Sequence, residues 1–309
     1  MNILKDIEDL VKSEVISEEV AIKIQDYYKN KSLNKSNRLF VVFGVLGALL
    51  IGLGIILILA HNWDNFSKIT KTILAFLPLV TAQIAGFYTL FKKNDSAAWR
   101  ESSATLIFFT VGSSISLISQ IYNIPGNLNS FVLTWMILIL PLVYIFRSSM
   151  LSLLYIAGIT FYACSTNYWS YPSEQNYYYW LLLVLIIPFY YFIYKKKPES
   201  NFTYFNHWFI PLSITICLGI VARSQEEIMF LAYFSLFAIF YAIGNSKLFK
   251  DVKNFKNSYL VIGSFATVVL LISMSFDWFW MDLYRLEFIF LSNEFIVASL
   301  LFILASIIL

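Results

Sequence analysis

Long apolar segments alternate with short polar ones from Leu39 to the end of the chain. Most of the apolar segments have about 17 residues or more, which is enough for a helix to cross the hydrocarbon core of a bilayer. We therefore predict an all-α, polytopic membrane protein with about ten transmembrane helices. The predicted spans are residues 39–60, 69–91, 103–124, 130–146, 150–166, 178–194, 208–223, 228–245, 259–276 and 288–309.

Residues 1–30 follow a different pattern, because they are polar and contain no apolar segment that ends in the small-residue cleavage site of a signal peptide. Apolar residues recur at helical spacing before and after Ser17, which can cap a second helix with Glu18 and Glu19 in its first turn. We predict a cytoplasmic helical hairpin over residues 1–30, followed by a basic linker over residues 31–38. Such a hairpin can dock a cytoplasmic protein partner.

The distribution of Lys and Arg between the spans predicts the orientation of the chain. From residue 31 onward, fourteen of these residues lie on the side of the membrane that holds the N-terminus, and four lie on the opposite side. Because cytoplasmic loops are enriched in Lys and Arg, we place the N-terminus in the cytoplasm and the protein in the cell inner (cytoplasmic) membrane.

Composition agrees with this class and excludes others. Of the 309 residues, 59% are hydrophobic and 13% are charged, against about 25% charged in a soluble domain. The net charge of +3 comes from loop lysines, so the lipid bilayer is the expected partner and nucleic acid is not. Cys164 and Cys217 both lie in apolar segments, where isolated thiols are expected to be small packing residues.

Polar and aromatic side chains gather where the spans reach the predicted external side. Four of them follow the first span, three end the third span, and one lies about one and a half turns into the fourth. The candidate ligand-binding residues are His61, Asn62, Trp63, Asp64, Gln120, Tyr122, Asn123 and Trp135.

Several of these candidates also have a purely structural interpretation. His61 can titrate or bind a ligand beside Asp64, or it can face lipid headgroups. Asp64 can cap a short turn, and Trp63 can anchor the interface. Gln120 lies about one turn below the boundary, where an amide needs a partner on a neighbouring helix or a ligand. Gln83 lies in the middle of the second span, where we expect its amide to form a hydrogen bond to another helix.

Small residues allow two of the spans to approach closely. Gly44, Ala48 and Gly52 are each four apart and share one face of the first span, and the third span has small residues of its own. We therefore expect residues 61–64 to fold back over the external mouth of the bundle, with their polar side chains near Gln120 and Asn123.

Four stretches resemble a known family. They are "SEVISEEVAIKI", "GVLGALLIGLGIILILAHNWD", "AWRESS" and "ISLISQIYNIPG", the last of which is followed by Trp135 and Pro141. They resemble the predicted membrane protein family catalogued as domain of unknown function 2157, over about residues 5–165. The resemblance implies a bacterial multi-pass membrane protein, often with further helices after the shared region. It implies no activity, so it transfers no catalytic residues.

The resemblance divides the predicted membrane part in two. Residues 39–166 form a family-like membrane domain with five spans, and residues 178–309 supply five further spans. The last span stops at Leu309 with no cytoplasmic charge after it, which favours a chain that continues beyond this residue.

Three functions stay open. The first is transport or binding of a small polar solute or lipid headgroup through an externally open pocket between spans one to four. The second is a structural or regulatory membrane subunit with a cytoplasmic docking hairpin. The third is an outer-leaflet enzyme that uses His61 and Asp64 as an acid–base pair, and we favour a protein that is not an enzyme. The chain has no Gly-rich phosphate loop, HExxH or CxxC motif, so we expect no catalytic residues, cofactor or metal.

The topology can be tested with single cysteines in a background that lacks Cys164 and Cys217. Cysteines on the predicted external side should react with an impermeant maleimide in intact spheroplasts, and those on the cytoplasmic side should not. Labelling in the reverse sense would overturn the assignment of spans. The external positions are Asp64, Asn127, Glu174, Glu226 and Asp282, and the cytoplasmic ones are Lys93, Lys196 and Lys253.

Overall fold

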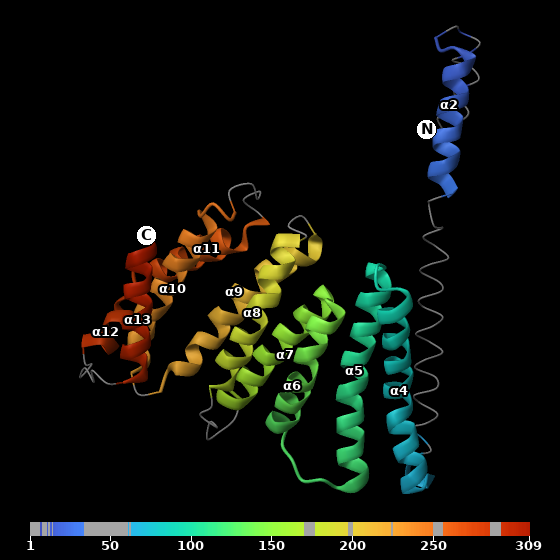
Figure 1. Ribbon diagram of the computed structural model, residues 1–309. Coiled ribbons are helices and arrows are strands. Elements are labelled where there is room, and N and C mark those ends of the chain that lie inside the picture. The colour runs from blue at the N-terminus through green and yellow to red at the C-terminus, as the bar shows by residue number, and fades with distance from the viewer. Residues whose placement is uncertain are drawn as a thin grey trace. The chain divides into compact units, whose positions relative to one another are not determined.

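The computed structural model describes most of the chain as helices. The described residues form two compact units, residues 1–67 and 68–309, and each is treated by itself. All regular elements in the described ranges are helical, so the predicted all-α class is confirmed (Figure 1). These ranges are residues 7, 11, 13, 15–33, 61, 63–169, 177–196, 200–223, 225–249, 256–284 and 292–309.

In the first unit, helix α2 (Glu18–Leu33) begins where the sequence predicts. The carbonyl of Ser17 accepts hydrogen bonds from the N–H groups of Val20 and Ala21, and two glutamates occupy the first turn. The first helix of the predicted hairpin falls mostly on residues outside the described ones, so the hairpin stays a prediction. Helix α2 also includes the first three residues of the predicted linker. The rest of that linker and the first predicted span lie outside the described residues.

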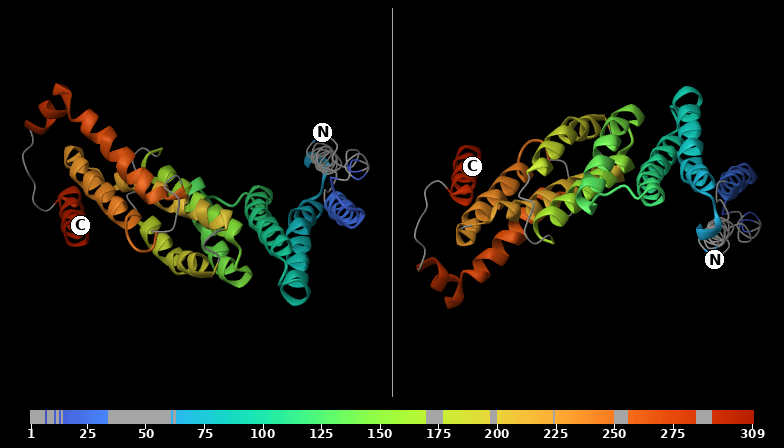
Figure 2. Two further views of the ribbon diagram at one scale, coloured as in Figure 1. Left: turned by 90° about the horizontal axis from the view of Figure 1, so that it is seen from above. Right: turned by 90° about the horizontal axis from the view of Figure 1, so that it is seen from below.

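The second unit consists of helices that run back and forth, as Figures 1 and 2 show. Apart from the first, each predicted span coincides with a helix or with most of a helix. The helices are α4 (Lys68–Lys92), α5 (Ala97–Tyr122), α6 (Leu128–Phe146), α7 (Ser149–Asn167), α8 (Tyr178–Lys196), α9 (Asn201–Leu218), α10 (Met229–Gly244), α11 (Ser258–Ser273), α12 (Asp277–Tyr284) and α13 (Asn293–Ile308).

Some ends differ from the predicted ones. Helix α5 begins at Ala97, and α9 at Asn201, each well before the predicted spans at residues 103 and 208. The added residues of both helices mix apolar and polar side chains, such as Arg100 and Glu101 in α5 and Asn201 and Asn206 in α9, so apolar content alone did not detect them. The outer loop expected after residue 277 begins with the short helix α12.

Among the described residues, seven helices are long and apolar enough to cross a membrane. Helices α11 and α13 are apolar but have 16 residues each, which corresponds to about 24 Å of helix. The protein is therefore a membrane protein with several candidate spans, and the predicted number of about ten is not confirmed.

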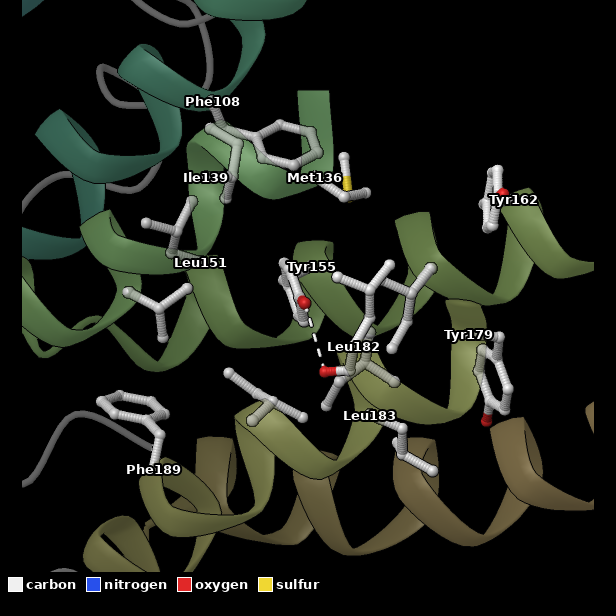
Figure 3. Packing of buried hydrophobic residues seen from close by; sticks show 14 of the residues in the cluster. Phe108, Met136, Ile139, Leu151, Tyr155, Tyr162, Tyr179, Leu182, Leu183 and Phe189 are labelled. Carbon is white, nitrogen blue, oxygen red and sulfur yellow. Dashed lines mark hydrogen bonds between the residues drawn. The ribbon is translucent and has the colours of Figure 1, made fainter. Parts of the chain in front are cut away.

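Two hydrophobic cores hold the second unit together. The first is built from buried residues of α4 to α9, and Figure 3 shows its central part, where the Tyr155 hydroxyl of α7 donates to the carbonyl of Leu182 in α8 (3.2 Å). The second core joins the end of α9 to α10, α11 and α13. Helix α9 contributes to both, because Ile210 lies in the first and Leu218 in the second.

Two carboxylates hold loops by binding backbone N–H groups. Glu101 of α5 accepts hydrogen bonds from the Ser148 hydroxyl and from the N–H groups of Ser149 (3.1 Å) and Met150 (2.9 Å) at the start of α7. Glu294, fully buried in the first turn of α13, accepts from two N–H groups in the turn that precedes α10. Helix starts carry N–H groups without intrahelical partners, so a nearby carboxylate is favourable.

The second histidine of the chain, His207 in α9, is 1% exposed. Its Nδ1 lies 2.5 Å from the Tyr190 hydroxyl of α8, which accepts a hydrogen bond from the Tyr259 hydroxyl of α11 (3.3 Å). The Ser258 hydroxyl also donates to the carbonyl of His207. This network joins α8, α9 and α11. His207 is not among the residues predicted from the sequence, because one polar residue inside an apolar segment produces no periodic signal.

We expect Glu101→Ala to lower the stability of the protein by about 2 kcal/mol or more, because hydrogen bonds to charged groups contribute about 1.5–3 kcal/mol. Thermal unfolding of the purified protein in detergent measures the effect. Glu101→Gln keeps one acceptor oxygen and should lose less. The matched control is Asp95→Ala, since Asp95 is an exposed carboxyl in the turn just before α5. A wild-type melting temperature for Glu101→Ala would contradict the role assigned to Glu101.

Candidate functional site

A pocket of ≈ 910 Å³ lies between α4, α5, α6 and the turn that joins α5 to α6. This volume is in the range of pockets that bind small molecules. The pocket is lined by apolar side chains and by hydroxyl and amide groups, and no charged side chain is among the described residues that line it. Its chemistry is therefore that of an uncharged hydrogen-bonding site.

The turn between α5 and α6 has a conformation that its sequence explains. Asn123 ends α5 in the left-handed region (φ 49°, ψ 44°), which Asn tolerates better than most residues. Asn127 and Ser130 then form a capping box at the start of α6, in which the Asn127 side chain accepts from the Ser130 N–H (2.8 Å). Pro125 and Gly126, between these caps, line the pocket. The two caps therefore fix the backbone on either side of the turn that lines the pocket.

Two glutamine amides line the pocket at different depths. Gln120 lies in the last turn of α5, and Gln83 lies in the middle of α4. From their positions in these antiparallel helices, we place them about 20 Å apart along the helix axis. Both side chains are exposed, and neither amide has a hydrogen-bond partner among the described residues. We expected a hydrogen bond from Gln83 to another helix. No such bond is found within the described part of the chain.

Hydroxyl groups lie between these two amides. On α6, Ser130 and Thr134 line the pocket one turn apart, and on α5, Ser116 and Ser119 do the same. Ser130 and Thr134 are not among the site residues predicted from the sequence, although their spacing from Asn127 places the three residues on one helix face. Some of these hydroxyl hydrogens already take part in hydrogen bonds within the protein. The Thr134 hydroxyl, for example, donates to the Ser130 carbonyl (2.8 Å). Their oxygen lone pairs can still accept a bond from a ligand.

Of the candidates selected from the sequence, Gln120 lines this pocket and three others in the same unit do not. The Tyr122 hydroxyl lies 3.0 Å from the Thr72 hydroxyl of α4. Asn123 serves as the C-cap of α5. The Trp135 indole N–H donates to the carbonyl of Phe108 (2.9 Å), and the ring packs against the Phe108 ring at 4.6 Å. These three residues have contacts within the helix bundle, so a ligand-binding role for them stays a prediction.

The remaining candidates belong to the other unit. Asp64 lies in a short 3₁₀ turn, Trp63–Asn65, and both His61 and Asp64 are exposed. Asn62 lies outside the described residues. The expected approach of residues 61–64 to Gln120 joins the two units, so it stays a prediction.

The pocket lies in the part of the chain for which a family is found. Residues 8–152 match the family model described as "Predicted membrane protein (DUF2157)". The resemblance inferred from the sequence is confirmed over this range, which includes α4, α5 and α6. No curated protein and no solved structure matches the chain. The family description assigns no activity, so the function has to be argued from the site.

No group of three or more His, Cys, Asp or Glu side chains that could hold a metal ion occurs among the described residues. Cys164 and Cys217 are both buried and free. The pocket itself offers only neutral oxygen and nitrogen groups on otherwise apolar walls. Such a lining can orient a ligand, and it contains no described side chain that would act as a nucleophile–base pair.

We expect Gly112→Ala to lower stability by about 1–3 kcal/mol, which is typical of overpacking. A Cβ at this position would lie 2.6 Å from the Trp135 ring, and the ring cannot move without losing its bond to Phe108. Thermal unfolding in detergent measures the loss. Gly126→Ala is the control, because a Cβ there meets its nearest atom at 3.8 Å. If Trp135→Phe in the same chain does not relieve the loss, the assigned clash is wrong.

Proposed function

We propose that the protein binds an uncharged, hydroxyl- or amide-bearing solute or lipid headgroup in the pocket between α4, α5 and α6. The observation that carries this proposal is the pair of glutamine amides, Gln83 and Gln120. Both line the pocket, and neither has a hydrogen-bond partner among the described residues. An amide at membrane depth is costly without a partner, so a ligand that supplies one gains affinity.

The absence of charge in the described lining supports a neutral ligand. Moving an ionised group into a site of low dielectric constant without a counter-charge costs several kcal/mol or more. Amides and hydroxyls, in contrast, match the donors and acceptors of sugars, glycerol and amides. The proposal is therefore for a polyhydroxyl or amide group, and not for an inorganic ion or a carboxylate.

The elongated pocket favours binding with one end near the turn at Gly126 and the other near Gln83. The two amides are too far apart for one small solute, so a free solute would bind beside one of them. A lipid would place its headgroup among Gln120, Asn127 and Ser130 and its chain along the apolar walls. We propose that the turn lies on the external side of the membrane, because the Lys-rich turns lie at the opposite helix ends.

Photolabelling of the reconstituted protein with a diazirine-bearing monohexosyl diacylglycerol tests the proposal. We expect labelled peptides from α5 and α6. We also expect Gln120→Leu to reduce labelling about tenfold, because it loses a hydrogen bond of about 1–1.5 kcal/mol to the headgroup, whereas Gln83→Leu, at the other end of the pocket, should reduce labelling less. Gln25→Leu is the control, since Gln25 is an exposed glutamine of α2. All variants should melt at the wild-type temperature.

The same experiment separates the two sources of the ligand. Competition by excess free glucose indicates a soluble solute, and labelling that resists glucose indicates a lipid headgroup. Equal labelling of wild type, Gln120→Leu and Gln83→Leu would refute the proposed function, as would equal labelling by an anionic phosphatidylglycerol probe with the same chains.

A further inference from the structure

A second cavity of ≈ 400 Å³ lies in the other part of the bundle, between α8, α9, α10 and α13. Its walls are apolar over most of their length. It is lined by Ile214 and Leu218 on α9, by Val221 in the 3₁₀ helix η2 (Gly219–Val221) that continues α9, and by Val297 and Leu301 on α13. The spacings place each set on one helix face. From Asn293 to Leu301 this groove follows α13 for about 12 Å. Its shape and lining suit one hydrocarbon chain.

The groove has a polar group at one end. Tyr177 and Asn293 line that end, and the Asn293 amide donates to the Tyr177 hydroxyl (3.3 Å). The guanidinium of Arg223 stacks on the Tyr177 ring, with its central carbon 5.0 Å from the ring centre. This stacking holds a cation beside the mouth of the groove.

Acidic groups lie close to this cation in the chain. Glu226 and Glu227, both exposed, form the first turn of the 3₁₀ helix η3 (Glu226–Ile228), three and four residues after Arg223. Glu294 is also close, but it is fully buried and accepts hydrogen bonds from backbone N–H groups. Among the described residues, Arg223 thus brings a cation to the mouth, and two solvent-exposed carboxylates follow it in the same turn. Both signs of charge complement a zwitterionic headgroup.

We propose that this groove binds a zwitterionic phospholipid. One acyl chain lies along α9 and α13, the phosphate contacts Arg223, and the headgroup ammonium faces Glu226 and Glu227. A guanidinium has five N–H donors in a fork that suits phosphate. The polar end must decide which lipid binds, because an acyl chain gains little by moving from the bilayer into an equally apolar groove. The groove lies outside the residues that match the family model, and its proposed ligand differs from that of the first pocket.

Native mass spectrometry of the full chain, released from nanodiscs of mixed composition, tests this site. The probes are phosphatidylethanolamine, phosphatidylglycerol and diacylglycerol with identical acyl chains. We expect at least fivefold more retained phosphatidylethanolamine than either of the other two. Arg223→Gln should lower its retention at least fivefold while leaving the backbone bond from residue 223 to Glu294 in place.

Two matched controls separate the site from general effects of charge or bulk. Lys256→Gln removes another cation that stacks on a tyrosine, at 4.4 Å from the Tyr204 ring centre and away from the groove. Ile296→Trp should fill the groove and prevent retention, whereas Leu300→Trp adds the same bulk at an exposed position of α13 that does not line it.

Three results would overturn the proposal. The groove is not the site if Ile296→Trp retains as much phosphatidylethanolamine as Leu300→Trp. The phosphate contact is wrong if diacylglycerol is retained equally or if Arg223→Gln behaves like Lys256→Gln. The zwitterionic preference is wrong if phosphatidylglycerol is retained as well as phosphatidylethanolamine. None of these results depends on the pocket between α4, α5 and α6, so the two proposals fail separately.

Discussion

The binding of backbone N–H groups by buried or half-buried carboxylates determines how the turns of this bundle are held. A helix start has N–H groups without intrahelical partners, and near hydrocarbon they need partners from the protein. Glu101 supplies them at the start of α7, and Glu294 supplies them in the turn before α10. Each carboxylate joins segments that are far apart in sequence. Acidic residues in a chain of this class can thus be structural, and an acidic side chain near a span is not by itself a proton-transfer group.

Helix α9 connects the two hydrophobic cores, and polar contacts fix its position. Its side chains bond to two neighbouring helices, through Asn206 and Ser152 of α7 (3.0 Å) and through Ser213 and the Tyr179 hydroxyl of α8 (2.7 Å). Such bonds specify how apolar helices pack, because lipid competes equally well for their apolar surfaces. His207 belongs to the same set of contacts. Its burial and its aromatic neighbours indicate a packing role.

The two cavities differ in the chemistry of their linings. The pocket between α4, α5 and α6 has amides and hydroxyls along much of its length, whereas the groove beside α13 is apolar and has its polar groups at one end. The first kind of lining selects a ligand along its whole length. The second accepts any hydrocarbon chain and selects by the headgroup. The family match includes the first pocket and ends before the residues that line the groove.

The sequence by itself determined the class of the protein, the positions of most helices in the second unit and the presence of polar residues at their ends, because apolar length and periodicity are local properties. It also identified Gln120 and Gln83 as amides that need partners. Only the tertiary structure decided which polar groups meet. It gave Trp135 a backbone partner at Phe108, brought Glu294 to the turn before α10 and enclosed His207 in aromatic rings. Each of these contacts joins residues from different helices or from a helix and a distant turn. Such pairings depend on how the helices pack, and no local sequence pattern records that.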